Sequence, residues 1–194
     1  MVRTRAFDPN AALADAMRVF ASQGYTNTSI DDVVKATGVS RYGLYGTFGN
    51  KRELFERALE KYTENMGRAS FLRLLAPDSG LKDIRATFVE RLDHMFDQEE
   101  KTACLVVLTA MEMAPHDEDL EAVLNKLMLQ MSKCYAIGLE HAQERGEVRA
   151  DLELSKAGRF LTGAFFGMSV MSRSGFTRES LDAYVDSTLA GLAA

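Results

Sequence analysis

Apolar residues recur three or four positions apart through most of the chain, which is the spacing of one helix face. The first such segment extends from Asp8 to Gly24, with Pro9 at the first helical position, where its missing N–H costs nothing. Glycines and turn residues separate the segments that follow. We predict these further helices at residues 28–38, 40–49, 51–70, 81–98, 101–114, 116–145, 154–173 and 177–192. The pattern therefore predicts an all-α fold.

The segment 40–49 differs from the others because few of its side chains suit a protein interior. Only Leu44 and Phe48 are large, purely apolar side chains that could hold this helix to a core. The remaining residues are small, cationic or hydroxylated: Ser40, Arg41, Tyr42, Gly43, Tyr45, Gly46 and Thr47. A helix, a turn containing Gly38 and this second helix have the order of a helix-turn-helix unit. The alternative is a purely structural three-helix bundle, which would be expected to carry more aliphatic residues and fewer glycines here.

Charge is distributed unevenly along the chain. The net charge is −5, yet residues 1–52 hold seven Lys or Arg against four Asp or Glu, and the remainder holds 16 against 24. This asymmetry predicts a basic N-terminal region of about +3 followed by an acidic body. A small positive region can attract DNA phosphates whatever the total charge.

Three stretches carry a resemblance to a known family. They are F-A-S-Q-G-Y at 20–25, T-S-I-D-D-V-V at 28–34 and A-T-G-V-S-R-Y-G-L-Y-G-T-F-G-N-K-R-E-L-F at 36–55. Residues 8–60 resemble, without a gap, the DNA-binding domain of the TetR/AcrR family of bacterial transcriptional regulators. Many members have a His or Tyr pair before the Phe and a Pro after it, whereas Gly46, Thr47 and Gly49 stand at those places here. The phosphate contacts of that aromatic pair are therefore not expected.

The resemblance implies that the helix at 40–49 enters the major groove of DNA. Arg41 can bind a guanine edge or a phosphate, and the Tyr42 ring can lie against a thymine methyl group. Tyr45 and Lys51 are implied as phosphate contacts, Lys51 at a helix N-terminus whose N–H groups also favour an anion. The candidate DNA-binding residues are Thr28, Ser40, Arg41, Tyr42, Gly43, Tyr45, Thr47 and Lys51. The alternatives are a solvated Arg41 and a Tyr45 that packs against its own protein.

The last two helical segments are candidates for a homodimer interface, because small residues there allow close helix approach. In the family, the corresponding helices form a four-helix bundle with the same pair from a second subunit. The candidate interface residues are Phe160, Gly163, Gly167, Met171, Leu181, Tyr184 and Thr188. The alternative is that these helices only complete the core of one subunit.

The resemblance also implies a small-molecule cavity within residues 81–145. The candidate lining residues are Phe88, Leu92, Met95, Cys104, Leu108, Thr109, Glu112, Met131 and Tyr135. Methionines adapt to irregular apolar ligands, although a Met stripe at helical spacing is also typical of an ordinary core. Glu112 and Thr109 are the candidate polar anchors, for a cationic or hydroxylated ligand; a partly exposed Glu112 is the alternative.

Cys104 raises a second possibility. The stretch A-C-L-V-V-L-T-A-M-E-M-A-P-H-D at 103–117 is similar to a segment of one branch of the family in which a cysteine senses electrophiles or oxidants. Cys104 near a helix N-terminus and close to Lys101 could have a lowered pKa. Most buried free cysteines are nonetheless inert.

Other function classes have little support in the sequence. The histidines His94, His116 and His141 have no metal-ligand spacing, and no phosphate-binding loop or nucleophile elbow is present, so we expect neither an enzyme nor a metal or cofactor. Two cysteines do not form a disulfide framework, no apolar run is long enough to span a membrane, and the N-terminus lacks a signal-peptide core. We therefore expect a cytoplasmic protein that does not bind membranes.

The sequence thus predicts two all-α domains: residues 1–52 for helix-turn-helix DNA binding, and residues 53–194 for ligand binding and dimerisation, linked by the helix at about 51–70. The predicted function is a ligand-responsive transcriptional regulator, a homodimeric repressor released from a palindromic double-stranded operator by a small-molecule effector. The alternative of the same fold is a small-molecule-binding protein or a thiol-based sensor of electrophiles or redox state.

Overall fold

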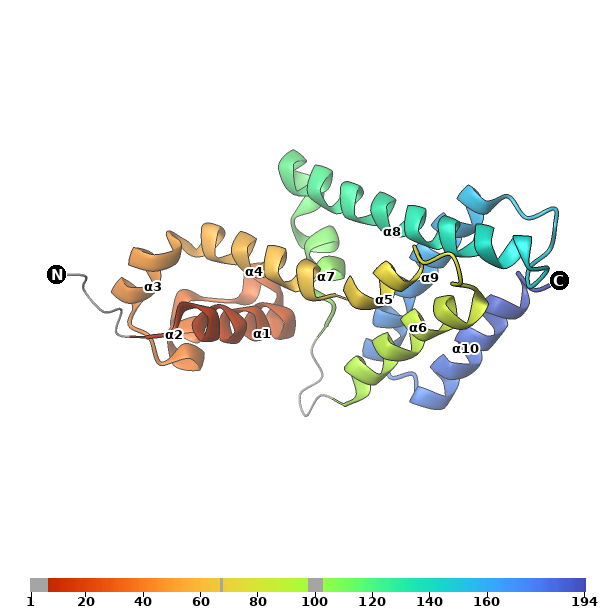
Figure 1. Ribbon diagram of the computed structural model, residues 1–194. Helices are drawn as coiled ribbons and strands as arrows, with labels where there is room; N and C mark the ends of the chain where they lie inside the picture. The colour runs from red at the N-terminus through yellow and green to blue at the C-terminus, as the bar shows by residue number, and fades with distance from the viewer. Residues whose placement is uncertain (1–6, 67, 98–102) are drawn as a thin grey trace. The chain divides into compact units, whose positions relative to one another are not determined.

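The computed structural model describes residues 7–66, 68–97 and 103–194, and their regular structure is helical (Figure 1). The helices are α1 (Pro9–Asn27), α2 (Ile30–Thr37), α3 (Arg41–Phe48), α4 (Lys51–Asn65), α5 (Arg68–Arg73), α6 (Leu81–Phe96), α7 (Leu105–Glu112), the 3₁₀ turn η1 (Ala114–His116), α8 (Glu118–Glu144), α9 (Leu154–Arg173) and α10 (Arg178–Ala190). The only extended pairing among these residues is an isolated antiparallel bridge between Val148 and Ala193. The all-α prediction is confirmed.

The chain divides into two compact units. The first consists of Met1–Met66 with Thr102–Asp117, and the second of Gly67–Lys101 with Glu118–Ala194. The predicted domain boundary after Arg52 stays a prediction, but the structure groups the rest of α4, together with α7 and η1, with the first three helices. Those additions hold two basic and six acidic residues, so the first unit as a whole carries nine Lys or Arg and ten Asp or Glu. The excess of positive charge is therefore confined to residues 1–52.

Aromatic packing forms the core of the first unit. The Phe20 ring of α1 meets the Phe55 ring of α4 edge to face, with ring centroids 5.1 Å apart, and Tyr25 meets Phe55 at 4.9 Å. Leu44 and Phe48 of α3 are 0% and 4% exposed, as expected for the two anchors of that helix. From α7, which lies some 80 residues further along the chain, Leu105 and Val106 are fully buried.

Side chains at the helix starts explain where the helices begin. Ser29 and Asp32 form a reciprocal capping box at α2, and Asn50 and Glu53 form another at α4. Ser40 accepts a hydrogen bond from the Gly43 N–H at α3. Such caps satisfy N–H groups that have no partner within the helix, and each is worth about 1 kcal/mol. The predicted starts of these helices are thereby confirmed.

The predicted helix at 51–70 is correct as far as Asn65 and wrong beyond it. Helix α4 ends at Asn65, because Met66 leaves helical conformation with φ −67° and ψ 88°. A separate short helix, α5, then begins at Arg68. The sequence has a glycine, Gly67, between these two helices, and glycine has a low helix propensity.

The second unit packs α8 and α9 closely and brackets them with α5, α6 and α10. Tyr135 of α8 is completely buried between Phe71 and Phe88, and its hydroxyl lies 2.8 Å from the Thr87 hydroxyl. This burial raises the pKa of Tyr135. Gly158 of α9 faces the backbone of α8, where an added Cβ would lie 2.3 Å from the Ser132 carbonyl oxygen.

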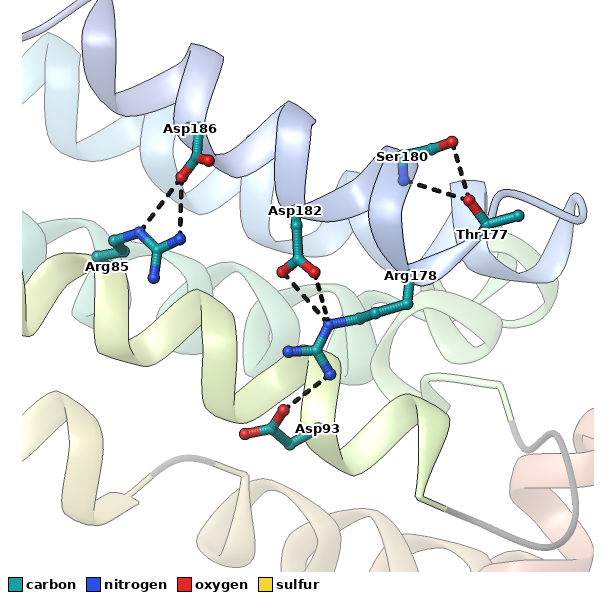
Figure 2. A network of polar contacts seen from close by, with 7 residues as sticks. All are labelled: Arg85, Asp93, Thr177, Arg178, Ser180, Asp182 and Asp186. Carbon is teal, nitrogen blue, oxygen red and sulfur yellow. Dashed lines mark hydrogen bonds and ion pairs between the residues drawn. The ribbon is translucent and has the colours of Figure 1, made fainter.

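Ion pairs join α6 to α10 on the surface of the second unit (Figure 2). Arg85 pairs with Asp186 at 3.0 Å, and Arg178 lies between Asp93 at 2.8 Å and Asp182 at 3.1 Å. Exposed pairs of this kind contribute little individually, so they mainly fix the register of the two helices.

Candidate nucleic-acid interface

Helix α3 presents a polar and aromatic face on a firmly held backbone. Gly38 in left-handed conformation (φ 66°) ends α2, and Ser40 then caps α3. Val39, Leu44 and Phe48 are buried, so the opposite face of α3 is left exposed. That face consists of Ser40, Arg41, Tyr42, Tyr45 and Gly46.

Tyr42 is the most exposed large hydrophobic residue among those described. Its side chain is 85% accessible, and Tyr45 on the next turn is 41% accessible. Exposing an aromatic ring to water forgoes the free energy of burying it, and such rings are common at binding surfaces. Tyr42 and Tyr45 therefore lie where a partner molecule can cover them.

Arg41 is already engaged within the first unit. Its Nη2 atom lies 2.6 Å from Oδ1 of Asp31 in α2, and both side chains are more than half exposed. The hydrogen bond with Asp31 raises the pKa of Arg41. Because the pair is solvent-exposed, Arg41 can exchange this partner for a DNA group at small cost.

The role expected for Gly43 changes with the structure. A Cβ at this position would lie 3.0 Å from Cγ1 of Val39 and 3.4 Å from Cε1 of Phe7. Gly43 therefore allows close packing inside the protein. Gly46, where an added Cβ would have no neighbour within 4 Å, is the more open glycine of α3.

Thr28 and Thr47 are less available than the sequence suggested. Thr28 is 1% exposed, and its hydroxyl donates to the Gly24 carbonyl over 2.6 Å, so it does not present a donor to an outside ligand. Thr47 is half-buried and lines an open groove of about 310 Å³ together with Pro9, Phe48 and Arg57. A threonine can either face solvent or bond to its own backbone. The sequence alone therefore did not show that Thr28 is buried and Thr47 half-buried.

Lys51, the first residue of α4, is held by the end of α1. Its Nζ atom lies 4.1 Å from the centre of the Tyr25 ring, a cation–π arrangement. Burial lowers the pKa of Lys51, while the carboxylates of Glu112 and Asp32 act in the opposite direction. The N–H groups of Arg52 and Glu53 already donate to Oδ1 of Asn50. An anion at this helix start would therefore depend mainly on the Lys51 side chain.

Sequence reasoning missed the contacts that residues 103–117 make with α1 and with the start of α4. Arg52 pairs with Asp117 at 2.6 Å, and Oε2 of Glu112 accepts a hydrogen bond from the Thr26 N–H over 3.2 Å. The Ala103 N–H also donates to the Ala21 carbonyl over 2.8 Å. These partners are more than 60 residues apart in sequence, and no local pattern indicates them.

The nine residues predicted to line a ligand cavity are divided between the two units. Phe88, Leu92, Met95, Met131 and Tyr135 belong to the second unit, and Cys104, Leu108, Thr109 and Glu112 belong to the first. Thr109 is buried, and its hydroxyl donates a hydrogen bond to the Leu105 carbonyl oxygen. Cys104 is 2% exposed. The Glu112 carboxylate accepts a hydrogen bond from the Thr26 N–H at the end of α1, so it already has a partner within the protein. Lys101, which was expected to affect Cys104, lies outside the described residues.

The predicted dimer face is partly exposed. On α9, Phe160 is 55% accessible, Gly163 is exposed, and Gly167 and Met171 are intermediate. On α10, Tyr184 is intermediate, but Leu181 and Thr188 are 0% and 7% exposed and belong to the core of the second unit. Helical periodicity shows that residues share a face but not whether that face is turned inward. Leu181 and Thr188 therefore add little to the exposed part of the predicted interface, which itself stays a prediction.

Comparison with known proteins shows which family has this arrangement. Residues 12–58 match the model of bacterial regulatory proteins of the tetR family, and residues 80–187 match the tetracyclin repressor-like C-terminal domain. The chain belongs to the TetR family. The resemblance seen in the sequence is thereby confirmed, and the protein is a helix-turn-helix transcriptional regulator.

Individual relatives extend the match over nearly the whole chain. An uncharacterized HTH-type transcriptional regulator, YezE of Bacillus subtilis, is 32% identical over 99% of this chain and 100% of its own length. The HTH-type transcriptional repressor ComR of Escherichia coli is 27% identical, covering 96% and 90%. A cysteine mutant of the TetR family transcriptional regulator CifR, solved in complex with 26-bp double-strand operator DNA, superposes with a TM-score of 0.85 at 28% identity, covering 98% and 99%.

Two searches of the described residues bear on other function classes. None of the described helices is long and apolar enough to cross a membrane. Within the described ranges, His, Cys, Asp and Glu side chains do not gather in groups of three that could hold a metal ion.

Proposed function

We propose that this TetR-family protein is a repressor that binds a palindromic operator as a homodimer and is released by a small molecule. The observation that carries the proposal is the exposed Tyr42 and Arg41 face of α3, held in place by the buried Leu44 and Phe48. A recognition helix needs side chains that can form hydrogen bonds or apolar contacts with base edges. It must also be held rigidly, because these contacts depend on short distances.

The proposed contacts fall into two groups. Arg41 and Tyr42 lie near the N-terminus of α3, the end that reads base edges in helix-turn-helix proteins. Ser40, Tyr45, Thr47 and Lys51 are proposed to contact the phosphate backbone, which positions the helix without specifying sequence. Gly43 supports the helix by packing, and Thr28 is left out of this set because its hydroxyl is buried.

Dimerisation supplies the second recognition helix. A single α3 spans only a few base pairs, so specific binding requires two copies set about one helical turn of DNA apart. The strip of α9 formed by the exposed Phe160 and Gly163 and the partly exposed Gly167 is the proposed contact between subunits. Its small residues permit close helix approach.

The effector is proposed to bind the second unit. The support is that residues 80–187, which include most of this unit, match the tetracyclin repressor-like C-terminal domain. A ligand that prefers one arrangement of the protein over another shifts the population and thereby changes operator affinity. We propose that the repressor acts in the cytoplasm, where chromosomal DNA lies, and that it is not an enzyme.

The thiol-sensor alternative has less support. Cys104 is 2% exposed, and burial raises the pKa of Cys134, whereas a reactive cysteine needs an accessible thiolate. The repressor hypothesis is therefore the one that we develop.

Operator preference is the decisive test. Fluorescence anisotropy would compare binding of the full-length protein to the duplex upstream of its own gene with binding to a scrambled duplex at moderate salt. We expect preference for the upstream duplex, and we expect Tyr42→Ala to lose that preference without a change in thermal unfolding, because the ring is 85% exposed. Equal affinity of the wild-type protein for both duplexes would contradict the proposal.

A further inference from the structure

Glu112 joins a distant part of the sequence to the corner between α1 and α2. Its Oε2 atom accepts a hydrogen bond from the Thr26 N–H over 3.2 Å. The corner has room for the carboxylate because Gly24, with φ 81°, carries no Cβ; an added one would lie 2.7 Å from Cδ of Glu112. L-residues rarely adopt this φ. Glycine at position 24 thus allows both the backbone conformation and the close approach of the Glu112 carboxylate.

The position of Glu112 in its own helix is unfavourable for a negative charge. It is the last residue of α7, where the helix dipole is negative and favours cations. A carboxylate at this end is stabilised only by groups from elsewhere in the protein. Here those groups are the Thr26 N–H and the positive charge of Lys51.

Lys51 lies against the Tyr25 ring, and Tyr25 directly precedes the Thr26 N–H that Glu112 binds. Its ammonium group is 4.1 Å from the ring centre, and the negative charges of Glu112 and Asp32 both favour its protonated form. A DNA phosphate at the start of α4 would have to attract the same ammonium group. The negative charge of Glu112 and that of a phosphate would therefore act on one and the same cation.

We propose that Glu112 is a positioning residue that competes with the DNA phosphate for Lys51 and thereby limits operator affinity. The proposal rests on the proposed function, in which Lys51 contacts the DNA backbone. In sequence, the segment Thr102–Asp117 is flanked on both sides by chain of the second unit, although it belongs to the first. A shift of this segment changes the counter-charge beside Lys51, which gives an effector a route to DNA affinity through the covalent chain.

Glu112→Gln separates the charge from the hydrogen bond, because the amide oxygen can still accept from the Thr26 N–H. We expect this variant to bind the operator about two- to fivefold more tightly than wild type, the size of one exposed ion-pair interaction. The gain should vanish when Lys51→Met is also present. Glu112→Asp keeps the charge while perturbing the corner, and it should stay within about twofold of wild type.

Glu60→Gln is the matched control for net charge. Glu60 is an exposed carboxylate on α4 of the same unit, and it is not among the charges that act on Lys51. Its neutralisation should change operator affinity less than Glu112→Gln does. Unfolding midpoints of all variants, measured in parallel, ensure that the affinities refer to folded protein.

The pKa of the Lys51 ammonium group, followed by NMR without DNA, gives a second readout. It should fall in Glu112→Gln, because the carboxylate holds it up. An unchanged operator affinity in Glu112→Gln, or an equal gain in the Lys51→Met background, would overturn the inference while leaving the proposed function standing. Failure of the wild-type protein to distinguish operator from scrambled duplex would instead contradict the proposed function itself.

Discussion

Arg41, the first residue of α3, is paired with Asp31 of α2 through a 2.6 Å contact between Nη2 and Oδ1. The bond links the proposed recognition helix to the helix before it and restricts the rotamers of a long side chain. Both partners are exposed, so the pair adds little to folding. Arg41 can therefore leave Asp31 for a base edge in the proposed complex at small cost.

Two alanine variants distinguish the pair's role in folding from its role in binding. Arg41→Ala should weaken operator binding by about 1–3 kcal/mol, the usual size of a good arginine–base contact. Asp31→Ala should change the free energy of unfolding by less than about 0.5 kcal/mol and leave Arg41 able to bind DNA. Anisotropy with operator DNA and urea unfolding measure the two effects.

Arg18→Ala is the control, since Arg18 is an exposed arginine of α1 that pairs with Asp15 three residues away. It should leave base preference unchanged. A loss of operator affinity as large as that of Arg41→Ala would show that the effect is one of general charge.

The local features of this fold were predictable from the sequence because they depend on neighbouring residues. The capping boxes at Ser29 and Asn50, the glycine end of α2 and the two anchors of α3 each involve residues within a few positions of one another. Short-range chemistry of this kind is encoded directly in residue order.

Contacts between distant segments were not predictable in the same way. Glu112 reads as a polar residue in an apolar helix, and nothing near it in sequence indicates that its partner is the Thr26 N–H. Similarly, helical spacing placed Leu181 and Gly163 among candidates for one interface, yet Leu181 is fully buried and Gly163 is exposed. Which side of an amphipathic helix meets solvent depends on the neighbouring helices, and a single sequence does not specify them.

Close approach of α8 and α9 predicts a strong effect at Gly158. A Cβ at this position would lie 2.3 Å from the Ser132 carbonyl oxygen, a backbone atom that cannot move without displacing α8. Gly158→Ala should therefore destabilise the protein by about 1–3 kcal/mol despite the better helix propensity of alanine. Urea unfolding followed by circular dichroism gives the free energy.

Gly46→Ala supplies the comparison, because an added Cβ there meets no atom within 4 Å. Relief of the entropic cost of glycine should make this variant as stable as wild type or slightly more stable. Equal destabilisation by the two substitutions would refute the close-packing explanation.

Acid sensitivity is expected from Glu147. Its side chain accepts hydrogen bonds from Nε of Arg145 at 2.8 Å and from the Leu81 N–H at 2.9 Å, and these contacts lower the pKa of Glu147. A carboxyl whose pKa is lower in the folded state contributes stability above its unfolded pKa of about 4.3, and this contribution is lost as the pH falls through the folded pKa. The wild-type unfolding temperature should therefore fall more steeply than that of Glu147→Gln below about pH 4.3.

Thermal unfolding of both proteins from pH 7 to pH 3 tests this difference. Because the Glu147 side chain is partly exposed, we expect a modest divergence of the two curves, confined to the acid range. Parallel curves throughout would mean that the Glu147 contacts do not persist in solution.

Self-association should depend on the exposed strip of α9. Gly163 has no neighbour within 4 Å of an added Cβ, so Gly163→Glu can be accommodated by one subunit without disturbing its core. In the proposed dimer the same position faces its copy across a two-fold axis, where two carboxylates and their side-chain volume would repel. We expect this variant to elute as a folded monomer in size-exclusion chromatography with light scattering, and to lose operator binding because one α3 covers too few base pairs.

Ala122→Glu, at an exposed position of α8, adds the same group elsewhere and should remain dimeric. A dimeric Gly163→Glu protein with full operator affinity would place the subunit interface on another surface.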